Sequence, residues 1–358
     1  MKSTKAAIIT IAAVTYSVLL IMFTEIVGDS VRNAVALCLT TVIPALFAFM
    51  VLCEFLISSG LYKALRRPFA GFSRYVFRIE PELFPVFLLS SVAGYPIGAK
   101  LLDKLYRKKS IDKKTAEDML CYCYLGGPAF ICGVAGANLF GGIIYGLIIF
   151  FSIFLSNIII GFALGLGRKV PHKRKLDNAA LKEEIGSEDM FSVFTSSVIL
   201  GARSVFAICA MIVFFSSVTA ILEGLGVFSF LSADSRAIAK SMIEISNIKE
   251  LTAGNLKLLP IAASLLSFGG ICVITQIKSF LHKSLSMKNF YFSRFASILS
   301  SYLCSKIVMN IVLKQEAVQT LNTASGVSAG SRYVSPLPAV FLLIMTVMLL
   351  SNRKDGRE

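Results

Sequence analysis

A short stretch rich in glycine and proline carries the residues whose types and spacing best suit ligand binding. In "SSVAGYPIGAKL", an apolar run is interrupted by Gly94, Tyr95, Pro96 and Gly98, and Lys100 follows at once. A helix that begins after such a break presents free backbone N–H groups and the positive end of its dipole. These groups and the Lys100 ammonium would together attract an anion. In the alternative interpretation, Lys100 extends to the membrane surface, as long cationic side chains do.

Four further polar residues are candidates for the same site. Glu244 and Asn247 lie in "EISN", and Gln276 ends "SFGGICVITQ". Glu244 could accept a hydrogen bond or bind a coupling cation, and Gln276 can both donate and accept. Arg203 lies about twelve residues into an apolar run, close to mid-bilayer depth at about 1.5 Å per residue, where it could pair a carboxylate. The alternatives are a solvated loop carboxylate for Glu244 and a position nearer the interface for Arg203.

Two Gly-Gly pairs occupy matching places in the two halves of the chain. Gly126-Gly127 is followed by Pro128, and Gly269-Gly270 recurs in the second half. Each pair follows a short, broken segment. Segments interrupted by glycine or proline at corresponding positions of inverted repeats are typical of transporter binding sites. A single pair would favour simple close packing of helices, whereas two matching pairs favour a site.

The sequence contains no pattern typical of catalysis or of metal binding. It has no phosphate-binding loop, nucleophile elbow or HExxH motif. The eight cysteines form no CxxC pair and are far from the two histidines, His172 and His282. We therefore expect no catalytic residues, no structural metal and no cofactor, with a coupling cation left open. The net charge of +15 fits cytoplasmic loops of a membrane protein better than nucleic-acid binding.

The composition indicates an all-α polytopic membrane protein in a lipid bilayer. The chain is 56% hydrophobic, and several runs approach the roughly 20 apolar residues that span a bilayer. Strict alternation, which would indicate a β-barrel, is missing. We expect about eight transmembrane helices, and their ranges are 6–23, 33–56, 119–140, 143–166, 192–222, 256–277, 290–313 and 334–350.

Basic residues predict the orientation of these helices. The positive-inside rule places both termini and the charged loop 168–190 in the cytoplasm, and the link that holds Glu25 and Asp29 outside. It also keeps Arg107–Lys114 inside, so 82–105 must enter and return on the same side as a re-entrant hairpin. Glu54 is expected at the cytoplasmic interface. The alternative is a helix pair at the membrane face with an ordinary Gly-Pro turn.

The order of spans and breaks predicts two inverted repeats. The first repeat covers 31–167 and holds the hairpin 82–105; the second covers 191–313 and holds a less apolar broken segment, 229–252. An N-terminal transmembrane anchor, 1–30, precedes them, and the cytoplasmic loop 168–190 joins them. A C-terminal helix and basic tail, 314–358, follows.

Three motifs carry a resemblance to a known family. "SSVAGYPIGAKL", "CYLGGPAFICGVAGANLFG" and "SFGGICVITQIKSF" resemble the sporulation integral membrane proteins with nucleoside-recognition (Gate) domains. The resemblance covers about residues 31–313, and the last motif is also similar to a segment of concentrative nucleoside transporters. One departure concerns "EISN", which usually continues to glycine and here continues to Ile248. That departure puts the geometry of the second hairpin in doubt.

The resemblance implies two helical hairpins, two broken helices and movement of a small solute across a membrane of a spore-forming bacterium. For one branch the implied solute is dipicolinic acid, which passes from mother cell to forespore, and the implied location is the outer forespore membrane. The alternatives are a nucleoside or nucleobase transporter and a non-transporting scaffold of a sporulation complex. Homo-oligomers or other sporulation membrane proteins are possible partners.

The hairpin interpretation predicts the accessibility of the basic stretch after it. A cysteine in Lys109→Cys should resist an impermeant thiol reagent added outside the cell, because this stretch returns to the cytoplasmic side. Asn138→Cys, in the predicted outer turn, is the matched positive control, and the parent chain measures the reaction of the native cysteines. Labelling of Lys109→Cys from outside at the rate of Asn138→Cys would show that 82–105 crosses the membrane.

Overall fold

The computed structural model of the chain describes residues 2–66, 68–169 and 189–323. It divides into Met1–Val308 and a second unit from Met309, of which only the end of one helix is described. Every regular element in the described ranges is helical, and no strand occurs among them. The all-helical class that the sequence predicts is therefore confirmed for this part of the chain.

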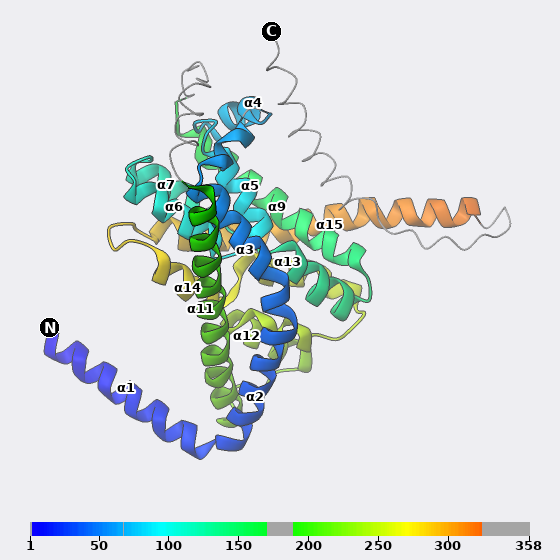
Figure 1. The fold of residues 1–358 in the computed structure, drawn as a ribbon. Helices are drawn as coiled ribbons and strands as arrows, with labels where there is room; N and C mark the ends of the chain where they lie inside the picture. Colours follow the sequence, from blue (N-terminus) through cyan, green and yellow to red (C-terminus); the bar gives the residue numbers. More distant parts are fainter. Residues whose placement is uncertain (1, 67, 170–188, 324–358) are drawn as a thin grey trace, which may run out of the picture. The chain divides into compact units, whose positions relative to one another are not determined.

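The helices follow one another in short and long pieces (Figure 1). They are α1 (Lys2–Met22), α2 (Thr24–Leu37), the π-helix η1 (Cys38–Val42), α3 (Ile43–Ser58), the 3₁₀-helix η2 (Leu61–Arg66), α4 (Ala70–Phe72), the π-helix η3 (Ser73–Phe77), α5 (Phe84–Ala93), α6 (Ile97–Arg107), α7 (Lys113–Leu120), α8 (Pro128–Phe130), the π-helix η4 (Ile131–Leu139), α9 (Ile143–Leu166), α11 (Met190–Gly224), α12 (Ala233–Ile243), the 3₁₀-helices η5 (Ile245–Glu250) and η6 (Leu256–Leu258), α13 (Leu259–Phe268), α14 (Gly270–Phe280) and α15 (Lys288–Thr323).

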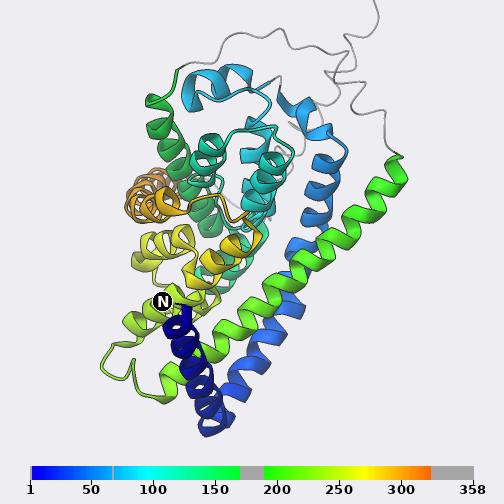
Figure 2. The same cartoon turned by 90° about the vertical axis from the view of Figure 1, so that its left-hand side faces the viewer.

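Two long helices run antiparallel and pack along most of their length (Figure 2). One is the continuous helix Thr24–Ser58, formed by α2, η1 and α3, and the other is α11; each has 35 residues. The Ser30 hydroxyl donates to the Ser216 carbonyl at 3.1 Å, and Gly201 lies against Val51. At about 1.5 Å per residue each helix exceeds the roughly 30 Å hydrocarbon layer, so its ends extend beyond it. Glu25 and Asp29 lie in the first turns of α2, so the predicted link between the first two spans is helical.

Five helices of the described residues are long and apolar enough to cross a membrane: Thr24–Ser58, Ile143–Leu166, Met190–Gly224, Leu256–Phe280 and Lys288–Leu313. They overlap five of the eight predicted spans. The expected span 6–23 becomes the shorter apolar helix Ala6–Met22, and 119–140 is broken into separate pieces. The expected span 334–350 lies outside the described residues. The chain is a multi-pass membrane protein by these helices.

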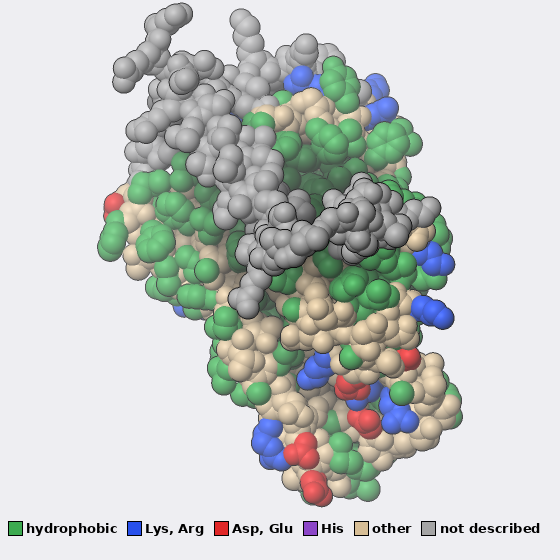
Figure 3. Space-filling view, turned by 90° about the vertical axis from the view of Figure 1, so that its right-hand side faces the viewer, with side chains coloured by type: hydrophobic (Ala, Val, Ile, Leu, Met, Phe, Trp, Pro, Cys, Tyr) green, Lys and Arg blue, Asp and Glu red, His purple; other side chains and the backbone are tan. Residues whose placement is uncertain are grey.

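Helix α15 turns its polar side inward and its apolar side outward. Serines recur every four residues on one side of this helix and are buried: Ser293, Ser297, Ser301 and Ser305. The exposed side carries apolar residues: Phe292, Phe295, Leu299, Leu303 and Ile307. The reverse pattern would be expected of a helix in water. Small hydroxyl side chains allow close approach between helices in lipid, where apolar faces need no cover. Figure 3 shows the same preference more widely, with many apolar side chains on the surface and charged ones grouped mainly at its margins.

The segments that connect the helices fall into two groups, and the members of each group contact one another. Arg78 donates to the Leu166 and Arg168 carbonyls, and Arg168 pairs with Asp118 at 2.7 Å. His282 N–H donates to Asp103 at 2.6 Å, so the loop after α14 joins this group. In the second group, the Gly254 N–H of the segment after η5 donates to the Leu139 carbonyl at the end of η4. The segment after α6 therefore lies with the connections that the basic residues predict to be cytoplasmic, as a hairpin that returns to its own side requires.

Candidate functional site

The first helix interruption separates α5 from α6. α5 ends at Ala93, Gly94 adopts a φ of +79°, and α6 begins at Ile97 after a cis peptide before Pro96. Glycine is required here for two reasons. A φ in this range disfavours a side chain, and a Cβ would lie 2.5 Å from the backbone nitrogen of Gly127. A Cβ on Gly98 would likewise overlap the carbonyl oxygen of Cys123. The glycines thus bring the hairpin tip directly against another backbone.

The backbone that the tip contacts is the second interruption. Residues 121–127 leave the helical conformation between α7 and α8, and all seven are buried. The side-chain amide of Asn157 on α9 donates to the Tyr124 carbonyl at 2.8 Å. This hydrogen bond satisfies a carbonyl that has no partner within a helix. Gly126 and Gly127 end this segment, and Pro128 starts α8, where its missing N–H costs nothing.

The third interruption separates α13 from α14 at the second Gly-Gly pair. Gly269 and Gly270 both have a φ of +80°. A Cβ on Gly269 would overlap the hydroxyl of Tyr124, which donates to the Phe268 carbonyl at 2.8 Å. The expected span 256–277 is therefore a broken helix, and its break touches the second interruption.

The fourth interruption follows α12 at Glu244. Glu244 is buried and accepts from both the N–H and the hydroxyl of Ser246, so it caps η5. Asn247 donates its amide to the Glu244 carbonyl at 2.9 Å. Gly270 packs on this turn, since a Cβ there would lie 3.1 Å from the Ser241 carbonyl oxygen. The alternative interpretation of Glu244, as a solvated loop carboxylate, is thereby excluded.

All four interruptions consequently form one connected cluster, which we call the break cluster: residues 94–96, 121–127, 268–270 and 244–247. The rings of Tyr95 and Tyr124 stack with centroids 4.8 Å apart, and the Tyr95 hydroxyl is 3.4 Å from the Leu266 carbonyl. Gly94, Gly98, Gly126, Gly127, Gly269, Gly270 and Glu244 all take part in these contacts. Residues from both halves of the chain meet here: Tyr124 and Phe268 are 144 positions apart in sequence, and Tyr95 and Leu266 are 171 positions apart.

Arg294 of α15 holds the break cluster together, and sequence reasoning missed it. Its side chain is 1% exposed and donates to the carbonyls of Cys121 and Ser267, one from each half. The guanidinium lies 4.4 Å from the centre of the Tyr124 ring, a cation–π distance. No ion pair joins it to an acidic residue of the described ranges. The signal in the sequence was an arginine inside an apolar run, the same signal that Arg203 gave.

Lys100 is paired rather than free. Its ammonium forms an ion pair with Glu54 of α3 and donates to the Ser204 hydroxyl of α11 at 2.7 Å. Glu54 is 2% exposed, so its carboxylate is buried within the protein, one turn before the end of α3. A carboxylate this deeply buried needs a cation beside it, and Lys100 supplies one. The hairpin is thereby tied to both long helices, and the interpretation that Lys100 simply extends to the interface is excluded.

The remaining predicted residues lie apart from these contacts. Arg203 is exposed on α11 and faces away from the neighbouring Ser204, so it does not reach the break cluster. Gln276 is buried on α14, where its amide lies 3.4 Å from the Cys272 sulfur one turn earlier. Among the described residues, no group of His, Cys, Asp and Glu is arranged to hold a metal ion.

Comparison with known proteins shows a distant similarity to a sporulation membrane protein. The chain is 28% identical over 129 residues to the sporulation integral membrane protein YlbJ of Bacillus subtilis (strain 168). That stretch is 36% of this chain and 32% of YlbJ. No protein-family model matches the chain, and no solved structure matches it. The chain is therefore an integral membrane protein with distant similarity to a sporulation membrane protein.

The cluster combines features that bind small polar molecules. Interrupted helices expose backbone N–H and C=O groups, and buried aromatic, carboxyl and guanidinium groups surround them. The carboxyl of Glu244 accepts from Ser246, and the guanidinium of Arg294 donates to the carbonyls of Cys121 and Ser267. Such an arrangement can recognise a solute by charge and shape without any covalent chemistry.

Replacement of Arg294 should destabilise the protein far more than replacement of Arg203. Arg294→Met leaves buried carbonyls without a donor, which costs about 1–3 kcal/mol for each group. We expect a clear fall in the melting temperature of the purified protein in detergent. Arg203→Met is the matched control, because it removes the same charge from an exposed position and should change little. Equal melting temperatures for the two variants would show that Arg294 does not hold the interruptions together.

Proposed function

We propose that the protein carries a small solute across the membrane and that the break cluster contains its binding site. The observation that carries this proposal is the meeting of four helix interruptions from both halves of the chain. Non-helical backbone at membrane depth persists only when it is buried in protein or lines a watery cavity. Here four helix interruptions meet in the break cluster, and a protein that only anchors itself in the membrane does not require such a meeting. In transporters built from repeats, such a place holds the solute.

We further propose that the hairpins 82–105 and 229–252 are re-entrant and that the two repeats are inverted. The contacts of Asp103, Glu117 and Asp118 with Arg168 and with the loop 282–286 support this arrangement for the first hairpin. The second hairpin has a short returning arm, η5, which ends close to Leu139. Cytoplasmic termini and a place in the outer forespore membrane belong to the same proposal. The relation to YlbJ supports a role in sporulation.

The solute that fits best is a small anion, with dipicolinic acid as the first candidate. Arg294 supplies a buried cation that no acidic residue of the described ranges neutralises. Lys100 could supply a second one when its pair with Glu54 opens. A nucleoside or nucleobase is the alternative solute, because stacked Tyr95 and Tyr124 suit a planar ring. Purified protein in vesicles, tested with dipicolinate and with a panel of nucleosides, distinguishes these solutes.

A scaffold of a sporulation complex is the second candidate function. The observation that favours it is the density of the break cluster, where Gly94, Gly98 and Gly269 leave no room even for a Cβ. A static protein would keep such contacts closed at all times. Absence of uptake for every solute in the panel, with correctly inserted protein, would favour the scaffold.

Gly94→Val should abolish transport per inserted molecule. The added side chain meets the backbone of Gly127 and forces the hairpin tip away from the second interruption. Membrane insertion depends on the long spans, which are unchanged. Gly133→Val is the control, since a Cβ there meets nothing within 4 Å. Uptake is divided by the amount of inserted protein, and a parental rate for inserted Gly94→Val protein would exclude the tip from the site.

Lys100→Met should slow an anionic solute more than a neutral one, because it removes a charge and keeps most of the side-chain length. The same change leaves Glu54 buried beside no cation. The double variant Glu54→Gln/Lys100→Met removes both charges and separates the two effects. We expect it to regain stability while transport of the anion stays low. Lys100→Arg should be milder than Lys100→Met, although the planar guanidinium is larger than an ammonium. Equal losses for anionic and neutral solutes would limit Lys100 to a structural role.

A further inference from the structure

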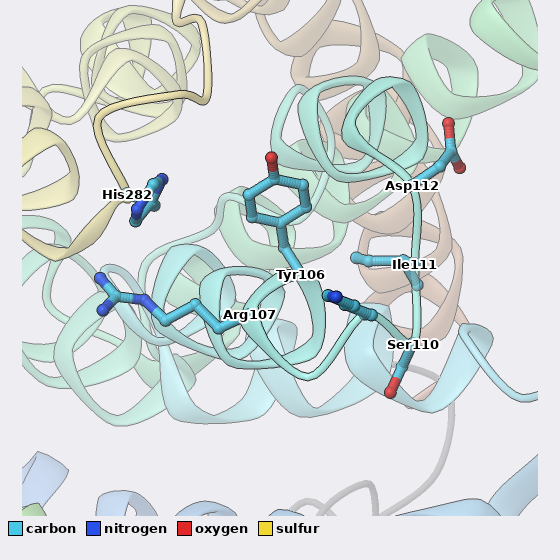
Figure 4. A pocket seen from close by; sticks show the side chains of 7 residues that line it. Tyr106, Arg107, Ser110, Ile111, Asp112 and His282 are labelled. Atoms are coloured by element: carbon cyan, nitrogen blue, oxygen red, sulfur yellow. The ribbon is translucent and has the colours of Figure 1, made fainter.

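A hollow distinct from the break cluster lies at the corner between α6 and α7. Its volume is about 620 Å³, and its lining includes Tyr106, Arg107, Lys109, Ile111 and His282 (Figure 4). The first four residues belong to the first half of the chain, whereas His282 comes from the loop between α14 and α15. The proposed solute-binding site does not include these residues.

The second half is fixed to this corner by three hydrogen bonds. His282 N–H donates to Asp103 at 2.6 Å, and Ser286 N–H donates to Glu117 at 2.7 Å. The Ser284 hydroxyl is 3.0 Å from the Tyr106 hydroxyl. Backbone N–H groups of the loop thus hold it to the first half, and within the loop the Nδ1 of His282 accepts the Ser284 N–H at 3.2 Å. The same Nδ1 lies 2.7 Å from the Ser284 hydroxyl, which leaves Nε2 available.

The charges around the hollow leave cationic groups without acidic partners. Asp103 is largely buried and is neutralised by the Nε of Arg107 at 2.6 Å. This leaves the two terminal nitrogens of Arg107 and the ammonium of Lys109 with no ion pair to any other acid in the described part of the chain. The pKa of Asp112 is lowered by its hydrogen bond from Thr115 at the start of α7, so this carboxyl is charged. In Figure 4 its carboxylate points away from Tyr106, while Arg107 and His282 lie on the other side of that ring.

Lys109 occupies a position that normally belongs to glycine. Its φ is +57°, and its N–H donates to the Tyr106 carbonyl at the end of α6. Helices commonly end on a left-handed residue of this kind, usually glycine, because a Cβ is strained there. A lysine at this point places an ammonium on the hollow at the expense of backbone strain, and such strain is found mainly at functional sites.

We propose that this hollow binds a phosphate-bearing anion through Arg107, Lys109 and His282. The planar guanidinium matches the spacing of phosphate oxygens, and an ammonium and an imidazole N–H add donors from two other directions. The hydroxyl of Tyr106 offers a further contact. Because the ligand would touch both α6 and the α14–α15 loop, it would strengthen the link between the two halves at the end opposite to Leu139. The phosphate could belong to a free anion or to a lipid headgroup.

The test measures binding to the purified full-length protein in non-ionic detergent at fixed salt. Inorganic phosphate is followed by equilibrium dialysis, and short-chain phosphatidylglycerol is followed by native mass spectrometry with phosphatidylcholine as the comparison lipid. Arg107→Gln and Lys109→Gly should each weaken the bound probe about tenfold or more, as expected for loss of a charged hydrogen bond. Lys109→Gly also relieves the strained φ, so this variant removes the ligand contact without endangering the fold.

Lys108→Gln is the matched control. It removes one positive charge from the same exposed stretch, but Lys108 does not line the hollow, and binding should change less than twofold. Binding of phosphate alone supports a free anion, and binding of phosphatidylglycerol alone supports a lipid headgroup. Failure of both probes to bind overturns the proposal. Equal weakening by Lys108→Gln and Lys109→Gly overturns it as well, because it would assign binding to diffuse surface charge.

Discussion

The backbone groups released at helix interruptions are the constraint on which the rest of this structure depends. In an apolar surrounding each unsatisfied N–H or C=O group costs several kcal/mol, so a membrane helix can be broken only where other groups replace its lost hydrogen bonds. Side chains of the protein supply them here. Asn157 donates to the Tyr124 carbonyl, Tyr124 donates to Phe268, and Arg294 donates to Cys121 and to Ser267. These donors explain why the breaks lie together.

The two halves of the chain consequently complete each other. Tyr124, from the first half, satisfies a carbonyl at the break of α13 and α14, and Arg294, from the second half, satisfies one at the break before α8. The serine side of α15 allows this helix to approach closely enough for Arg294 to reach both. Ser264 donates to the Ile298 carbonyl at 3.0 Å, and Ser156 of α9 is 2.5 Å from Ser300. Apolar side chains face outward, because lipid rather than water covers them.

The sequence predicts where helices break better than it predicts which side chains meet. Gly94 and the Gly126-Gly127 and Gly269-Gly270 pairs were recognised because glycine and proline act on the local backbone, whatever surrounds it. Arg203 and Arg294 gave the same sequence signal, a single cation in an apolar run. Only the rotation of each helix about its axis decides which one faces inward, and that rotation follows from packing between distant segments. The same reason hid the pairing of Glu54 with Lys100, whose partners are 46 residues apart on separate helices.

The contacts within the break cluster determine how easily the hairpin tip can separate from the second interruption. Gly94 and Gly98 meet the second interruption through backbone atoms, and Tyr95 beside them stacks on Tyr124. Backbone surfaces of this kind can separate without a change of rotamer, whereas packed side chains such as the two tyrosine rings resist gradual displacement. Polar side chains also hold the hairpin to the long helices. Lys100 pairs with Glu54 and donates to Ser204, and Lys104 donates to Ser58 at 2.8 Å. Under the transport proposal, the hairpin would leave its partner to admit a solute, so these links and the backbone contacts of the glycines would have to break and re-form together.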